Sequence, residues 1–373
     1  MRNRMFIAAI VLLGIASIFS LKSEAQILLG QPTSGGVQPV FSYWELKNSD
    51  VKIKLAQLAT PLSGFVPLGE NLEATFYFAG ASNELTTPTS EYSLSGVGDA
   101  RIQFSRSFSN DQLLFSGGFN IPTGKKKLDL SKEWLVIEYL SQNYLQFPFT
   151  KYGEGFGFNA LVGGATMLGK IRCGGGAMFE FTGEYEPYEG LDKYNPGDIF
   201  SLNGGIELGE SNRLLMANVI YTIFTTDQVA GKKIFKQSPL LELQTAASAG
   251  NEFGTAAVDI RYLARGRNTR YSEDESTLEQ LKFFGNELAA GLTLGKYFSR
   301  KWIFSLAGEM RLLGSNELNF GKSEIFGVGG GIASRPEERF GIGVDYRYFT
   351  GNVDDNRIEL TGHQVLVSLS ASL

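Results

Sequence analysis

Hydrophobic and polar residues alternate one by one over much of the chain, and the clearest example lies between Asp198 and Phe224. Successive side chains of a β-strand point to opposite faces, so this alternation places apolar groups on one face and polar groups on the other. The four residues from Gly209 to Asn212, between the two alternating stretches, all favour turns. The pattern therefore predicts an antiparallel hairpin. Its apolar face comprises Phe200, Leu202, Gly204, Ile206, Leu208, Leu215, Ala217, Val219, Tyr221 and Ile223.

Similar alternating segments recur from Val51 to the C-terminus. Each is roughly 9–14 residues long, which is near the length that a tilted membrane-spanning strand requires. No apolar run in this part of the chain approaches the ~20 residues of a spanning helix. The segments lie at about 51–66, 71–79, 98–108, 112–121, 155–168, 171–185, 198–208, 213–225, 239–249, 252–263, 284–298, 302–313, 321–333, 338–349 and 360–373.

The connections between these segments alternate between short turns, such as 169–170, and long loops, such as 122–154. Short turns on one side and long loops on the other are typical of outer-membrane barrels, in which the short side is periplasmic. The sequence therefore predicts an all-β fold, a transmembrane antiparallel β-barrel of about 14–16 strands over residues 51–373. The other long extracellular loops are predicted at 80–97, 186–197, 226–238, 264–283 and 350–359.

The N-terminus has the pattern of an export signal. Arg2 and Arg4 precede an apolar run, and Ser23-Glu24-Ala25 forms a small-x-small cleavage site. We therefore predict a cleaved signal peptide over residues 1–25 and a location in the bacterial outer membrane. Residues 26–50 are compatible with a mobile segment, a plug or a first strand. The final strand ends on the apolar Leu373, similar to the C-terminal signal by which barrels engage the assembly machinery.

Composition excludes several classes of function. The net charge is −5, so there is no basic excess for nucleic acid. The single cysteine, Cys173, forms no internal disulfide and falls at an apolar strand position. No motif for a cofactor or for zinc is present, and the acidic loop segments 273–275 and 352–356 fit solvated loops better than a Ca²⁺ site. The only histidine, His363, is in phase with the apolar face, which disfavours a membrane enzyme that would use it as a base.

The polar faces of the strands supply the candidate lining of a lumen. Four strands carry an acid-x-Arg pair, and alternate residues share a face. These charges are compatible either with an ion network that holds the strands in register or with a solute pathway. The candidate pathway residues are Asp99, Arg101, Glu207, Asp259, Arg261, Glu309, Arg311, Asp345 and Arg347, with Arg172, Glu180 and Glu242 as further inward charges and Leu161, Met167, Leu214, Met216, Ile220 and Phe224 as inward apolar positions.

The loop from Thr123 to Glu154 is strongly aromatic. An apolar loop of this size is unstable in water, so we expect it to fold into the barrel mouth or to meet lipid. Ser131 is predicted to cap a short helix that runs to about Leu140, with Glu133 in its first turn. The loop is either a constriction on the solute path or a packed cap on the rim. The candidate constriction residues are Trp134, Tyr139, Tyr144, Phe147, Phe149 and Tyr152.

Basic residues are frequent in the predicted extracellular loops. They are suited to bind phosphates of outer-membrane lipids and lipopolysaccharide, although solvated loop charge explains them equally well. These residues are Lys125, Lys126, Lys127, Lys232, Lys233, Arg265, Arg267 and Arg270.

Two stretches, Ser95–Arg101 and Phe119–Lys125, carry a "GxGD … P-T-G" pattern. This pattern resembles that of a bacterial outer-membrane family described as transporters of phenol-degradation pathways, which is similar in outline to channels for fatty acids and aromatic hydrocarbons. The resemblance implies a channel without a cofactor, for passive diffusion of a small hydrophobic or aromatic solute through the lumen. The alternative is a structural or adhesive barrel with a closed lumen. The Asn-Pro-Ala plug signature of the fatty acid channels is absent after Gln26.

Overall fold

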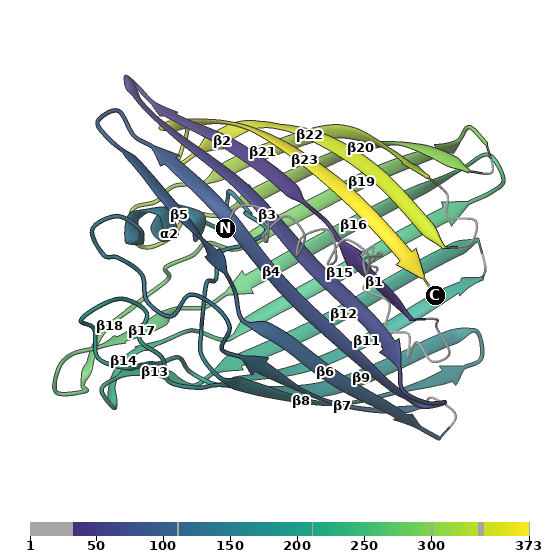
Figure 1. Cartoon of the computed structure of the whole chain (residues 1–373), viewed down its shortest axis with the longest axis horizontal. Coiled ribbons are helices and arrows are strands. Elements are labelled where there is room, and N and C mark those ends of the chain that lie inside the picture. The colour runs from purple at the N-terminus through teal and green to yellow at the C-terminus, as the bar shows by residue number, and fades with distance from the viewer. Residues whose placement is uncertain (1–32, 110–111, 211, 300, 335–338, 373) are drawn as a thin grey trace, which may run out of the picture.

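The chain folds into a closed antiparallel barrel of sixteen strands, which falls within the predicted range. The computed structural model describes residues 33–109, 112–210, 212–299, 301–334 and 339–372, so the predicted signal peptide lies outside the described residues. Figure 1 shows the strands strongly tilted across the barrel. Among the described residues, no helix is both long and apolar enough to cross a membrane.

Two of the sixteen strands of the wall are each broken into two pieces. The first consists of β1 (Ser34–Val37) and β2 (Val40–Asn48), and the fourth of β5 (Glu91–Val97) and β6 (Ala100–Phe108). The others are β3 (Val51–Pro67), β4 (Leu72–Thr86), β7 (Leu113–Ile121), β8 (Gly157–Leu168), β9 (Ile171–Thr182), β11 (Ile199–Glu210), β12 (Arg213–Phe224), β15 (Leu240–Gly250), β16 (Gly254–Arg265), β19 (Glu287–Tyr297), β20 (Trp302–Leu313), β21 (Ser323–Ser334), β22 (Phe340–Val353) and β23 (Ile358–Ser372).

The barrel closes where β23 pairs with both β1 and β2. Residues 34–48 are therefore part of the wall, and the first strand begins before Val51. The predicted hairpin at Asp198–Phe224 forms as β11 and β12, with Leu202 opposite Tyr221 and Ile206 opposite Ala217. Large apolar side chains on the outside of the barrel remain exposed to the surroundings, as a lipid-facing surface requires.

Two of the predicted long loops are mostly strand. Residues 80–97 form the ends of β4 and β5, which are joined only by a turn at Thr87–Ser90, and residues 350–359 form the ends of β22 and β23. The loop prediction was wrong because these strands extend past the length needed to cross a membrane. Their inner faces pack against protein in the barrel mouth, and this contact is not encoded in the local alternation.

Three other predicted loops combine into a second, smaller sheet at the long-loop end (Figure 1). We call it the outer sheet. Its strands lie in the order β10 (Tyr194–Asn195), β13 (Thr226–Val229), β14 (Lys232–Lys236), β17 (Asn268–Tyr271) and β18 (Thr277–Leu281). Each strand is short, so neither its strands nor their pairing stands out as a periodic segment of the sequence.

The segment between β7 and β8, residues 122–156, folds into the barrel at the long-loop end and is called the inner loop. It contains α2 (Trp134–Leu140), the helix that the sequence predicted, but this helix begins later than expected. Glu133 occupies the N-cap position without a side-chain cap, and the Ser131 hydroxyl donates instead to Asp129 Oδ1 at 2.6 Å. The capping prediction was therefore wrong: Ser131 belongs to an Asx turn that precedes the helix.

The main hydrophobic core lies between the inner loop and the inner face of the wall. Loop side chains such as Leu140 and Leu145 pack in one cluster with wall side chains such as Leu55, Leu85 and Phe349. A barrel of this size has a lumen too wide for its own side chains to fill. The inner loop therefore fills the part of the mouth next to β2–β5 and β20–β23.

Candidate functional site

The predicted pathway residues on β16, β20 and β22 all face the lumen. Cross-strand partners in an antiparallel sheet point to the same side. Arg261 on β16 and Arg311 on β20 share the partner Ala289 on β19, whereas Asp259 and Glu309 share Gly291. The same register places Arg347 and Asp345 on the inner face of β22. The alternation in the sequence had therefore assigned the inner face correctly.

The charges on this wall pair mostly between strands rather than within the acid-x-Arg units. Glu309 accepts from Arg347 at 2.8 Å and lies 3.4 Å from Arg311. Among the described residues, neither Asp259 nor Asp345 has an ion-pair or hydrogen-bond partner for its side chain. Arg311 is only 4% exposed, and its guanidinium also lies over the rings of Trp44 and Phe349. Such a buried cation requires this combination of partners.

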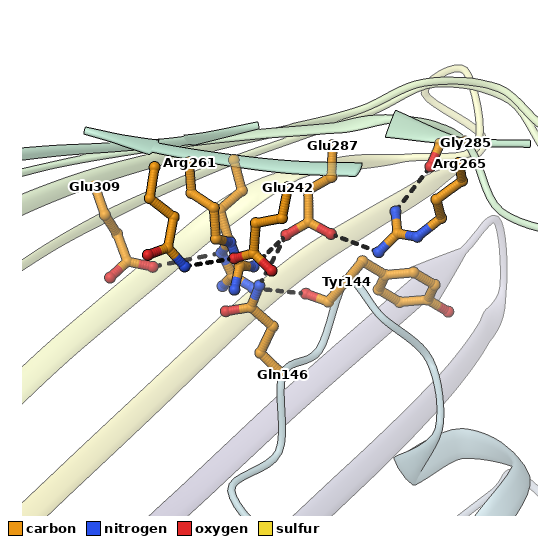
Figure 2. Close-up of polar contacts among 10 residues, drawn as sticks. Tyr144, Gln146, Glu242, Arg261, Arg265, Gly285, Glu287 and Glu309 are labelled. Atoms are coloured by element: carbon orange, nitrogen blue, oxygen red, sulfur yellow. Dashed lines mark hydrogen bonds and ion pairs between the residues drawn. The ribbon is translucent and has the colours of Figure 1, made fainter. Parts of the chain in front are cut away.

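Glu287 forms a second centre that the sequence analysis did not single out. It is buried and accepts from Arg261 at 2.9 Å and from Arg265 at 3.2 Å. Gln146 of the inner loop also donates to it at 3.3 Å, and Figure 2 shows this loop residue approaching the charged wall. Glu287 is in phase with the inward positions of β19, so its phase could have identified it. The sequence could not show that Glu287 is buried, because the inner loop that covers it is distant in sequence.

Glu207, another of the predicted pathway residues, pairs with Arg172 at 2.8 Å. The two residues are direct cross-strand partners on β11 and β9, near the short-turn end of the barrel. An acid and a base opposite one another stabilise the strand register and cancel each other's field. This pair therefore contributes a dipole, rather than a net charge, to the lining of the lumen.

Asp99 was predicted as a pathway residue, and the structure shows that both its carboxylate oxygens bind the ends of the inner loop. It lies in the break between β5 and β6, where it accepts the backbone N–H of Gly124 at 2.8 Å and that of Glu154 at 2.7 Å. The Thr123 hydroxyl meets the same break, accepting from Ala100 N at 2.9 Å and donating to Gly98 O at 3.2 Å. The two halves of the "GxGD … P-T-G" pattern are therefore in direct contact.

The glycine at the end of this pattern is required by close packing. A Cβ at Gly124 would collide with the backbone carbonyl of Tyr152. A second contact between the wall and the inner loop is made by Gln57 on β3, which is fully buried. Its side-chain amide forms two hydrogen bonds with the loop: it donates to Phe149 O at 2.6 Å and accepts from Phe149 N at 3.2 Å. The amide of Gln57 thus pairs with the loop as a neighbouring strand would.

The far side of the inner loop is fixed to the charged wall. Arg311 donates to the carbonyl of Tyr144 at 3.1 Å, near the contact between Gln146 and Glu287 (Figure 2). The loop therefore crosses the lumen from the β3–β5 side to the β19–β20 side. The expectation that it folds into the barrel mouth is confirmed.

The predicted aromatic residues of the inner loop have two different surroundings. Trp134 is 42% exposed and meets Tyr188 edge to face, and Tyr139 is half-buried. The other four are buried in the core cluster: Tyr144, Phe147, Phe149 and Tyr152. Most of the aromatic residues therefore hold the loop in place.

A cavity of about 360 Å³ lies in the lumen on the side that the inner loop leaves free. We call it the glycine cavity because its floor consists of glycines on β8, β9 and β11, which leave the wall without inward side chains. Around this floor are the apolar side chains of Leu161, Met216 and Ile220 and the amides of Asn203 and Asn218. The Arg172–Glu207 pair forms part of the same lining. The lining therefore combines apolar groups with neutral polar groups and one compensated ion pair.

His363 lies on the outer surface of the barrel, as its phase predicted. Its Nδ1 is 2.8 Å from the hydroxyl of Tyr346, and the rings of Tyr43 and Tyr348 lie nearby. Aromatic residues on the outer face are typical of the interfacial belts of barrels. This environment fits a role in that belt.

Most basic residues of the outer loops form ion pairs with acids of the same chain. Arg267 pairs with Glu317, and Arg270 with Glu279. Lys125, Lys127, Lys233 and Arg265 pair with Glu133, Glu186, Glu275 and Glu287. The acids at 352–356 are also engaged, since Asp354 and Asp355 accept from the backbone of Gly321 and Lys322. No cluster of three or more potential metal ligands occurs in the part of the chain that the structure describes.

No family model and no curated protein matches the chain. Solved barrels are similar over nearly the whole length of both chains. The CymD monoaromatic hydrocarbon channel is 12% identical, with 96% of this chain and 95% of that chain covered and a TM-score of 0.45. The COG4313 outer membrane channel from Pseudomonas putida F1 is 10% identical, with coverage of 96% and 100% and a TM-score of 0.43. The translocator domain of autotransporter NalP from Neisseria meningitidis is 11% identical, with coverage of 99% and 96% and a TM-score of 0.38.

The closed sixteen-strand wall, its apolar outer face and its long loops at one end are the features of an outer-membrane β-barrel. By these features of its own structure, the chain is an outer-membrane β-barrel.

Proposed function

We propose that this protein is an outer-membrane channel through which small hydrophobic or aromatic compounds pass by passive diffusion. The observation that carries the proposal is the glycine cavity, an open part of the lumen lined by apolar side chains, neutral amides and a compensated ion pair. Ligand sites for apolar molecules combine mainly apolar walls with a few polar groups. A path for ions would instead need uncompensated charge along its lining.

The paired charges of the opposite wall support the same proposal. Arg261, Arg265, Arg311 and Arg347 all have acidic partners, so none of these four cations is free to attract an anion. Their role in the proposed channel is to fix the strands and the inner loop. The solute then passes beside the inner loop rather than through it.

The test fills the glycine cavity without changing charge. Gly163 and Gly174 face the lumen, and an added Cβ would meet no atom closer than 3.5 Å and 3.3 Å, respectively. The double variant Gly163→Val/Gly174→Val should sharply reduce uptake of radiolabelled toluene by cells that lack other porins. Ala177→Val is the control, since Ala177 on β9 is the cross-strand partner of the lipid-facing Leu202 and does not line the glycine cavity. Equal uptake by wild type, the double variant and cells without the protein would overturn the proposal.

The second candidate is a structural or adhesive barrel with a closed lumen. The extensive core between the inner loop and the wall favours it, because this core closes part of the mouth. Conductance in planar bilayers separates the two functions. A closed barrel gives no current, whereas the proposed channel gives a small steady current that the double variant reduces.

A further inference from the structure

A second cavity, of about 200 Å³, lies between the wall and the inner loop, away from the glycine cavity. We call it the Arg101 cavity. The wall side is formed by strands β4, β6 and β7, and the loop side by residues 148–154. It adjoins the strand break in which Asp99 binds both ends of the inner loop.

Three polar side chains form a row across the wall of this cavity. Tyr77 on β4 is the cross-strand partner of Arg101 on β6, and Arg101 is the partner of Asn120 on β7. Cross-strand partners point to the same face, and neighbouring strands lie about 4.8 Å apart. A phenol, a guanidinium and an amide are thus presented side by side, and all three line the cavity.

None of these three side chains has a hydrogen-bond or ion-pair partner among the described residues. Asn120 is only 8% exposed, but its amide atoms do not belong to the fully buried side-chain atoms that lack a partner. The amide therefore opens onto the cavity and is free to bind a polar group that enters it.

Among the described residues, Arg101 has no hydrogen bond or ion pair with an acid. Asp99 and Glu154 line the same cavity, but the Asp99 carboxylate accepts two backbone N–H groups and Glu154 pairs with Lys151 at 2.7 Å. Every other lumen arginine of the predicted pathway has an acidic partner within 4 Å. Arg101 therefore stands apart as a cation that is free to bind an anion.

The cavity also has an apolar part. Pro148 and the buried Phe149 form it on the loop side, beside the polar Thr150, Lys151 and Glu154, together with Ala79 of the wall. A cavity of 150 Å³ is sufficient for benzene, so about 200 Å³ accommodates one substituted ring. An aromatic ring would meet Phe149 while its substituent faces the polar row.

We propose that the Arg101 cavity binds small monocyclic aromatic carboxylic acids. The planar guanidinium of Arg101 takes both carboxylate oxygens, the Asn120 amide and the Tyr77 hydroxyl donate to the same group, and the ring packs on Phe149 and Pro148. A monoanion matches the single free cation, whereas a phosphate dianion would leave a negative charge unpaired in a partly buried site. This inference rests on the proposed function and specifies one class of compound that the channel recognises.

The test is calorimetric titration of the detergent-solubilised full-length protein with benzoate. Arg101→Gln should weaken binding by roughly 10- to 100-fold, the usual effect of losing a charged hydrogen-bond partner. The control is Arg270→Gln, which also removes a cation but from the outer sheet, where the residue lines neither cavity. Binding that Arg270→Gln leaves unchanged and Arg101→Gln weakens would support the site.

Asn120→Asp provides a second variant of nearly identical shape, and it should abolish benzoate binding by placing a carboxylate in the site. Benzyl alcohol, the neutral analogue, should bind at least tenfold more weakly than benzoate to the wild type. The inference is overturned if wild type binds no benzoate, if chloride or phosphate competes as well as benzoate, or if the Arg101 and Arg270 variants behave alike. The toluene uptake assay tests the proposed function separately, because toluene has no carboxylate.

Discussion

The two sides of the lumen use the same strand pattern for different purposes. On strands β2–β5 and β20–β23 many inward residues are large and apolar, and Leu55, Leu85 and Leu94 are each at most 1% exposed. On β8, β9, β11 and β12 several inward residues are glycines or amides, such as Gly174, Gly205 and Asn218, beside the Arg172–Glu207 pair. The first side is packed against the inner loop as in a globular core, and the second side lines the glycine cavity.

This difference shows that a cluster of large, fully buried apolar residues on the inner face marks a packing partner inside the lumen. Inward side chains would otherwise face water, and a large apolar one gains nothing there. The inner loop supplies the partner on one side only. The free path through the barrel is therefore displaced to the opposite side, where glycines leave the most room.

Removing the inner loop should have the largest effect on the difference between the two sides of the lumen. Replacing residues 127–150 by a short Gly-Ser linker takes away most of the protein that packs on this side, and we expect single-channel conductance to rise several-fold. The matched control shortens the turn between β13 and β14 in the outer sheet, which should leave conductance unchanged. Equal conductance of wild type and the loop-deleted protein would show that the loop does not restrict the lumen.

The next largest effect should be the difference in stability loss between a core leucine and a lipid-facing leucine. Leu55→Ala removes a buried side chain from the packed side and should lower the free energy of unfolding by about 2–5 kcal/mol, because a cavity remains. Leu202→Ala, on the lipid face of β11, should cost less, since lipid chains move into the space. Urea unfolding in lipid vesicles measures both. Similar losses for the two variants would contradict the assignment of a globular core.

The polar anchors of the inner loop should contribute a smaller amount. Asp99→Asn turns one accepting oxygen into a donor that faces a backbone N–H, and we expect a loss of about 1.5–3 kcal/mol together with faster proteolysis within the inner loop. Asp345→Asn is the control, because Asp345 also faces the lumen but has no contact with the loop. Protection of the loop that is equal in both variants would exclude Asp99 as an anchor.

The smallest effect concerns the exposed outer loops. The hydrogen bond from Arg267 lowers the pKa of the Glu317 carboxyl, with a further contribution from the backbone N–H of Lys282. A lowered pKa in the folded state adds stability above the unfolded pKa, and this stability is lost as the pH falls through the folded value. NMR titration should show the Glu317 carboxyl protonating at a lower pH than an ordinary glutamate, and Arg267→Gln should reduce this difference. Because the pair is exposed, 1 M salt should weaken it as well.

The sequence was sufficient for the features that depend on local alternation. The period of two residues indicated the strands and assigned Arg261, Glu309 and Arg347 to the lumen and His363 to the lipid face. The aromatic content of the loop at 123–154 also indicated that this loop packs against protein or lipid. It was not sufficient for strand ends, because β4, β5, β22 and β23 are lengthened by contacts with the inner loop, which comes from elsewhere in the chain.

The roles of individual side chains depended on contacts distant in sequence. Asp99 and Arg101 look equivalent as inward charges, yet one binds the inner loop and the other lines an open cavity without a partner. The sequence by itself determined the barrel, because the two-residue period fixes which side chains meet lipid. Only the tertiary structure decided where the lumen is filled and where it is open, because that depends on the path of one loop across a wide interior.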